Sequence, residues 1–273
     1  MRNSVLLLFL SVILAGCSGF SSDDGIPDRS DAFEGSEGLV VSFFDGAPPE
    51  KVFPGTSIQI ALLFENKGAA AINCDTTSDN PEGCGNFTVF SKEPIPVSNE
   101  GGLKEAVESL DDELIGKESY AAGGRAAHTI DNIVILDAAK TTSSIVFAAA
   151  CYPYETRLTT PICVSTAPFT VSKEDRVCDL EEIRLKDQGA PVAITKIEPS
   201  SFVEVDGDTT FVKPQLRVFL KNVGKGIVLE RSKTSFEKAC KAPDNTDDKG
   251  LDDTIVGKVL VKEASISGIP VTC

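Results

Sequence analysis

The feature that most constrains this chain is a strand-and-turn pattern that occurs twice. In both copies apolar residues at alternate positions precede an Asn-x-Gly turn: Ile60, Leu62 and Phe64 before Asn66-Lys67-Gly68, and Leu216, Val218 and Leu220 before Asn222-Val223-Gly224. Alternation is the period of a strand with one buried face. Asn and Gly both tolerate the positive φ angles of tight turns. The repeat predicts two related β domains, and the alternative is one domain with a chance similarity.

Other apolar stretches of strand length surround the two copies. They predict strands at residues 39–44, 87–90, 129–136, 144–152, 162–171, 192–197, 210–212, 256–261 and 264–272. We expect residues 156–161 to join two of these strands in a hairpin, with Cys151 facing Cys163. Short links and no β–α alternation favour two tandem β-sandwiches of immunoglobulin type, an all-β fold. The chain has no tryptophan, which excludes the Cys–Trp–Cys core of antibody domains.

Helical spacing interrupts the β pattern at two places. Leu103, Val107, Leu110 and Leu114 recur at intervals of four, three and four residues, with acidic residues on the other face. This period predicts a short helical insert in the first domain, where it would cover an open edge of the sheet. Residues 232–240 are expected to form a second short helix.

The N-terminal residues have the anatomy of an export signal. Arg2 supplies a positive start, and residues 5–15 form an apolar stretch that is too short to span a bilayer. The sequence Leu14-Ala15-Gly16-Cys17 resembles the lipobox of prokaryotic lipoproteins, which implies that Cys17 is lipid-modified and becomes the mature N-terminus. An ordinary signal peptide with a cysteine beside its cleavage site is the alternative.

These patterns divide the chain into five segments. Residues after Cys17 are acidic and offer almost nothing to bury, which predicts a solvated tether. The expected segments are a lipoprotein signal peptide at 1–16, a lipid-anchored acidic flexible tether at 17–37, a first sandwich at 38–172, a charged linker at 173–188 and a second sandwich at 189–273. Because Cys273 directly follows an apolar run, we expect the second sandwich to be truncated.

The cysteines of an exported protein are expected to form disulfides. Of the eight cysteines, seven remain once Cys17 carries lipid. The close pairs are predicted to be Cys74–Cys84 and Cys151–Cys163, followed by Cys240–Cys273, which leaves Cys178 without an internal partner. Zinc is disfavoured because the chain has no Cys-x-x-Cys pair and a single histidine.

The composition argues against several classes of function. A formal net charge of −15 disfavours binding to nucleic acid or anionic headgroups. His128 is the only histidine and no Gly-x-Ser-x-Gly motif accompanies it, so a serine hydrolase is the least supported class. We therefore expect His128 to be an exposed strand residue, the chain to be no enzyme, and no cofactor to be needed.

Two local motifs could carry ligands. The loop with Asp244, Asp247, Asp248 and Asp252 has enough carboxylates for calcium, but Thr246 and Lys249 break the EF-hand spacing. A solvated acidic loop is the alternative to a calcium site. Asn86-Phe87-Thr88 is a glycosylation sequon, which matters only in a host that glycosylates exported proteins.

Several short motifs point to one family. The two Asn-x-Gly strands resemble CARDB-type immunoglobulin-like domains of bacterial and archaeal surface proteins. Three further motifs resemble uncharacterised archaeal envelope proteins of this type: Ala47-Pro48-Pro49, Cys151-Tyr152-Pro153-Tyr154-Glu155-Thr156 and Gly189-Ala190-Pro191-Val192-Ala193.

This resemblance covers about residues 38–272 and implies β-sandwich modules on the cell surface, with no catalytic residues to transfer. The expected role is adhesive or scaffolding, with the membrane as one partner through the lipid and other envelope proteins as the second. The alternative is a lipoprotein that presents a solute or glycan to a membrane partner, which the low aromatic content disfavours.

Overall fold

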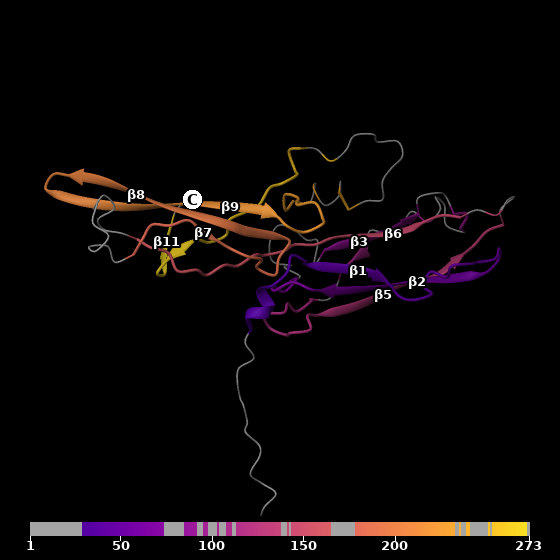
Figure 1. Cartoon of the computed structure of the whole chain (residues 1–273). Helices are drawn as coiled ribbons and strands as arrows, with labels where there is room; N and C mark the ends of the chain where they lie inside the picture. The colour runs from indigo at the N-terminus through magenta and orange to yellow at the C-terminus, as the bar shows by residue number, and fades with distance from the viewer. Residues whose placement is uncertain are drawn as a thin grey trace, which may run out of the picture. The chain divides into compact units, whose positions relative to one another are not determined.

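The chain is all-β in a computed structural model. The model describes residues 29–73, 85–91, 95–97, 103, 108–110, 113–137, 141, 143–164, 178–232, 235, 239–240, 251 and 253–271. Within these ranges the longest helical segment is the five-residue 3-10 helix η1 (Arg29–Phe33). The strands form several antiparallel sheets, as the sequence predicts (Figure 1).

Two three-stranded sheets carry the main hydrophobic core. The first has the order β1–β2–β5 and consists of β1 (Leu39–Phe43), β2 (Ser57–Asn66) and β5 (Arg125–Val134).

The second sheet has the order β4–β3–β6 and consists of β4 (Glu108–Ser109), β3 (Asn86–Ser91) and β6 (Val146–Cys151). Phe64 of β2 and Phe87 of β3 are fully buried, with ring centroids 5.0 Å apart. Their contact joins the two sheets in an arrangement that fits a β-sandwich.

A third sheet is dominated by one long hairpin. It has the order β7–β8–β9, with β7 (Ile183–Arg184), β8 (Val192–Asp206) and β9 (Thr209–Asn222). Figure 1 shows β8 and β9 as the long orange hairpin. Gly207 makes the tight turn between them at a φ of 60°, a conformation that favours glycine.

A small hairpin follows near the end of the chain. It consists of β10 (Ser265–Ile266) and β11 (Ile269–Pro270). The sequence predicts one continuous strand over 264–272 instead. The chain reverses at Ser267 and Gly268, which both have positive φ angles, and this turn divides the expected strand.

The repeated sequence pattern forms the same local structure in both copies. Asn66 Nδ2 donates to the carbonyl of Ala70 at 2.8 Å, and Asn222 Nδ2 donates to the carbonyl of Gly226 at 2.8 Å. In each copy the Asn Oδ1 accepts from the amide two residues later, that of Gly68 at 3.1 Å and that of Gly224 at 3.2 Å. Each asparagine therefore closes its own turn with the same two hydrogen bonds.

The strand pairing beside the turns is equivalent as well. Leu39 of β1 lies opposite Asn66, and Val192 of β8 lies opposite Asn222. The β1–β2 pair thus corresponds to the β8–β9 pair in order, direction and register.

The two copies differ in what covers them. Ile60, Leu62 and Phe64 of β2 are at most 1% exposed beneath the second sheet. Their counterparts in β9 lie 156 positions later (222 minus 66), and of these Val218 is 47% and Leu220 46% exposed. Leu216, the counterpart of Ile60, is half-buried. The same strand design is therefore buried in the first copy and partly open in the second.

The predicted helical insert is wrong in the residues that are described. Glu108–Ser109 forms strand β4 against β3, and Leu114 makes an isolated bridge with Ile72. Leu103, Leu110 and Leu114 are nevertheless buried in the main core. Helical spacing misled here because an irregular segment also brings leucines three or four residues apart into a core. Of the second expected helix, Ser235 and Ala239 are helical.

The predicted 144–152 and 162–171 hairpin is also wrong where it is described. β6 pairs along its whole length with β3, and residues 152–164 belong to no strand. Pro153 and Pro161 cannot donate to a strand ladder, which explains why this segment does not pair. Residues 165–171 lie outside the described part.

Ordered structure extends beyond the predicted boundaries. Part of the expected flexible tether forms η1, and Ala32 is only 6% exposed. The expected charged linker contains β7, which pairs with β8 at Ile197 and Lys196. In the expected strand at 256–261, Val256 makes a single bridge to Leu229 and the rest belongs to no strand.

Candidate functional site

The single histidine belongs to the margin of the core. His128 lies on β5 opposite Leu62 of β2. Its ring packs edge-on against the buried ring of Phe87, with 4.8 Å between centroids. His128 is half-buried, so the expectation of an exposed histidine is corrected. Its packing is that of a structural side chain.

The other predicted ligand residues give no site in the described structure. Cys17, Asp244, Asp247, Asp248 and Asp252 lie outside the described residues. Within the described part, no group of three or more His, Cys, Asp and Glu side chains is placed to hold a metal ion.

The sequon lies inside a sheet. Asn86 begins the central strand of the second sheet, opposite Cys151 on one side and Ser109 on the other. Thr88, the third residue of the sequon, is only 1% exposed. Asn86 itself is half-buried, and its glycosylation stays a prediction.

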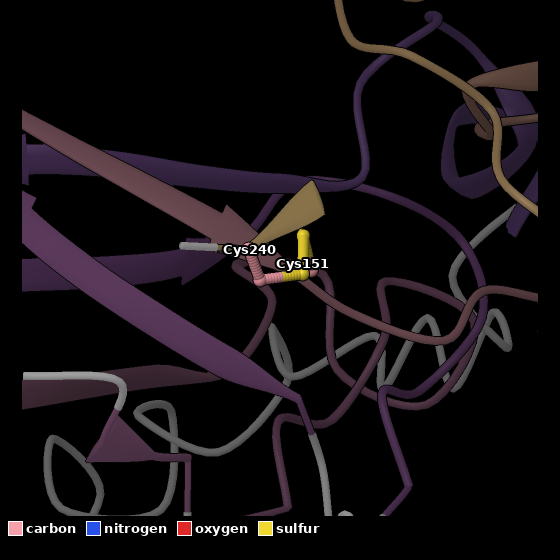
Figure 2. The surroundings of a disulfide bond; sticks show 2 residues. All are labelled: Cys151 and Cys240. Atoms are coloured by element: carbon pink, nitrogen blue, oxygen red, sulfur yellow. A yellow bond between two sulfur atoms is a disulfide. The ribbon is translucent and has the colours of Figure 1, made fainter. Parts of the chain in front are cut away.

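Within the described residues there are two disulfides, and neither is a predicted pair. Cys151 is bonded to Cys240, as Figure 2 shows, and Cys163 is bonded to Cys178. The predicted pairs Cys151–Cys163 and Cys240–Cys273 are therefore wrong, and Cys178 is not left over. The physical reason is the absent hairpin: since β6 pairs with β3, nothing places Cys163 opposite Cys151. Cys74, Cys84 and Cys273 lie outside the described residues.

The Cys151–Cys240 bond joins distant parts of the sequence. The two cysteines are 89 residues apart in the chain, with 5.8 Å between their Cα atoms. Cys240 is 2% exposed. The bond fastens the segment that follows β9 to the end of β6, a strand of the second sheet.

The motif around Tyr154 connects the two copies of the repeat. The Tyr154 hydroxyl accepts a hydrogen bond from the amide of Ala70 at 3.2 Å and donates one to the carbonyl of Gly189 at 2.9 Å. The Thr156 hydroxyl donates to the carbonyl of Val192 at 2.6 Å. One short irregular segment thus bonds the turn after β2 to the residues that begin β8.

This junction is too tightly packed to be a ligand site. A Cβ atom at Gly68 would overlap the Tyr154 hydroxyl, and one at Gly189 would lie 2.5 Å from the carbonyl oxygen of Ala32. Gly189 also has a φ of 62°. Burial raises the pKa of the Tyr154 phenol, so the hydroxyl keeps the proton that it donates. The motifs at residues 66–68, 151–156 and 189–193 therefore pack together, and their contacts are structural.

The β8–β9 hairpin has one charged face. Cross-strand partners point to the same side of a sheet. Glu198 lies opposite Arg217 and is two residues from Lys196, so these three side chains share one face of the hairpin. Glu198 accepts from Lys196 at 2.6 Å and from Arg217 at 3.3 Å, and Lys213 pairs with Glu204. These half-buried to exposed ion pairs mark the face that water solvates.

The opposite face of the hairpin is apolar and is open toward the hairpin turn and along the end of β9, whereas Ile197 near its base is buried. It carries no ionisable residue over the whole length of the hairpin, and it presents these side chains: Val192, Ile194, Ile197, Pro199, Ser201, Val203, Val205, Thr210, Val212, Pro214, Leu216, Val218, Leu220 and Asn222. Val203 and Val205 are 40% and 67% exposed. The reverse side carries the ion pairs but also exposed Phe202 and Phe211. An exposed apolar strip without charge is typical of an interaction surface. We call it the apolar hairpin face.

An open hollow lies elsewhere, beside the first sheet. It has a volume of about 350 Å³ and is lined by residues that include Glu113, Tyr120 and Arg125. Small-molecule sites are usually enclosed and bury most of their ligand. The hollow does not have this character, whereas the apolar hairpin face has the features of a protein-binding surface.

Comparisons with models of known protein families, with curated proteins and with solved structures find no match to this chain. In the described residues there is no helix with the length and apolar character needed to cross a membrane. The two disulfides are compatible with a protein that folds outside the reducing cytosol.

Proposed function

We propose that this chain is an exported lipoprotein whose two immunoglobulin-like modules bind proteins of the cell envelope and catalyse no reaction. Lipid on Cys17 holds the chain at the outer face of the membrane, and the acidic residues that follow separate the folded part from the bilayer. A lipoprotein cysteine with more than one acyl chain anchors stably, whereas a single chain binds reversibly.

The observation that carries this proposal is the apolar hairpin face. Val203, Val205, Val218 and Leu220 on this face are exposed, whereas Leu62 and Phe64, the β2 counterparts of Val218 and Leu220, are fully covered. An apolar strip of this size is costly to leave in water unless a partner covers it. The disulfides and the export pattern at the N-terminus support an extracellular setting for that partner.

The anchoring step predicts a mass change at one residue. In a prokaryotic host with a lipoprotein pathway, the mature chain should begin at Cys17, carry acyl groups there and sediment with membranes. The Cys17→Ser variant should lack the acyl mass and leave the membrane fraction. Mass spectrometry of the N-terminal peptide together with fractionation measures both. An unmodified Cys17 in the exported wild-type chain contradicts the proposal.

A further inference from the structure

We propose that the apolar hairpin face binds the same face of a second copy of this chain, so that two β8–β9 hairpins form one β-sandwich. This inference rests on the proposed function in one respect, namely that the face is a binding surface. It adds the identity of the partner.

The repeat shows what kind of cover such a face accepts. Around β2, the alternate apolar side chains pack against the sheet that contains β3 and β6. The equivalent positions in β9 need a cover of the same kind, a sheet with apolar side chains at every second position. The β8–β9 hairpin is itself such a sheet, because its Val218 and Leu220 correspond to Leu62 and Phe64 of β2.

The distribution of charge favours a second copy in this geometry. With a formal net charge of −15, two chains repel one another across most orientations. The apolar hairpin face carries no ionisable side chain, so two copies can meet through it without opposing like charges. The ion pairs of Lys196, Glu198 and Arg217 stay on the outer face of each hairpin, in water.

The size of the face fits a reversible dimer. β9 has 14 residues, and strands of that length are roughly 45 Å long. Two strands side by side are about 10 Å wide, so two copies would bury at most on the order of 1,000 Å² in total, because Ile197 is already buried; this is the lower end of specific interfaces. We therefore expect association in the micromolar range.

A competing arrangement uses the edge of β9 that pairs with no other described strand. In the order β7–β8–β9, β9 is an edge strand and could pair with another strand through its backbone. Edge pairing uses backbone hydrogen bonds, so a substitution should weaken it to a similar extent on either face of the hairpin. Face-to-face packing uses the side chains of one face, so only a substitution on the apolar hairpin face should weaken it.

Two substitutions of matched exposure separate these arrangements. Val218 on the apolar hairpin face is 47% exposed, and Phe211 on the charged face is 48% exposed. In sedimentation equilibrium of the full chain with Cys17→Ser, from about 1 to 100 µM, we expect a monomer–dimer equilibrium. Val218→Glu should weaken the dimer at least about tenfold, since each glutamate enters an apolar interface. Phe211→Glu should leave it within about threefold, since this position stays in water.

A second variant on the apolar hairpin face controls for the case in which Val218→Glu fails to fold. Val205→Glu lies next to the hairpin turn, where the side chain is 67% exposed, and it should weaken the dimer without lowering the melting temperature. A chain that is monomeric throughout the range, equal weakening by Val218→Glu and Phe211→Glu, or open-ended polymers would each overturn the inference. If the chain is monomeric but the exported wild type carries lipid on Cys17, the dimer inference fails and the proposed function stands. If the chain dimerises but the exported wild type carries no lipid, the dimer inference stands and the proposed function fails.

Discussion

Removal of the Cys151–Cys240 bond should destabilise the chain more than any other single change described above. The bond closes a loop of 89 residues, and the loss of such a closure from the unfolded chain is worth roughly 4 to 5 kcal/mol in the loop-entropy picture. We expect the double variant Cys151→Ala, Cys240→Ala to melt roughly 10 °C or more below the wild type. Thermal unfolding without reductant measures the difference.

The second disulfide is the matched control. Cys163 and Cys178 are 15 residues apart in sequence, so their removal should cost less, about 3 kcal/mol. Cys240→Ala alone should destabilise nearly as much as the double variant that removes Cys151 and Cys240. If Cys240→Ala melts like the wild type while Cys151→Ala does not, Cys151 has another partner and the disulfide assignment is wrong.

Replacing equivalent side chains of the two copies by alanine should lower the free energy of unfolding by unequal amounts. Phe64 is fully buried between the sheets and packs on Phe87, so Phe64→Ala should lower the free energy of unfolding by about 4 kcal/mol. Leu220, its counterpart, is 46% exposed, and Leu220→Ala should cost about 1 kcal/mol or less. Denaturant unfolding at submicromolar protein concentration, where the chain is monomeric, measures both. Similar losses at the two positions would contradict the difference in cover.

Local patterns predicted the strands and turns well. Alternating apolar residues located β2, because only an extended strand turns every second side chain to the same face. Short apolar stretches located β1, β3 and β6 to within a few residues. The Asn-x-Gly turns were predictable because the asparagine bonds within its own turn. Both signals depend on neighbours in sequence, and both are confirmed.

Long-range features were not predictable from the same patterns. Cys151 has Cys163 as a near neighbour in sequence, but its partner is set by which strand pairs with β6, and sequence spacing does not report that. The spacing of Leu103, Leu110 and Leu114 matched a helix, yet these side chains reach the core from irregular structure and short bridges.

Proline also made the predicted strands of the hairpin too short. Pro214 separated two expected strands, although β9 runs through it without a break. A proline is tolerated there because β9 is an edge strand, so the missing N–H removes no bond from a neighbouring strand. Whether a strand lies at the edge of a sheet depends on the strand order, and local sequence patterns do not predict that order.

The most direct test of this account is hydrogen exchange of the monomeric chain, followed by mass spectrometry of its peptides. Peptides from β2 should exchange only through global unfolding, because that strand is paired on both sides and covered by a second sheet. Peptides from the outer half of the β8–β9 hairpin should exchange at least about a hundredfold faster through local opening. Equal protection of β2 and β9 would contradict the claim that one repeated strand design is buried in its first copy and partly open in its second.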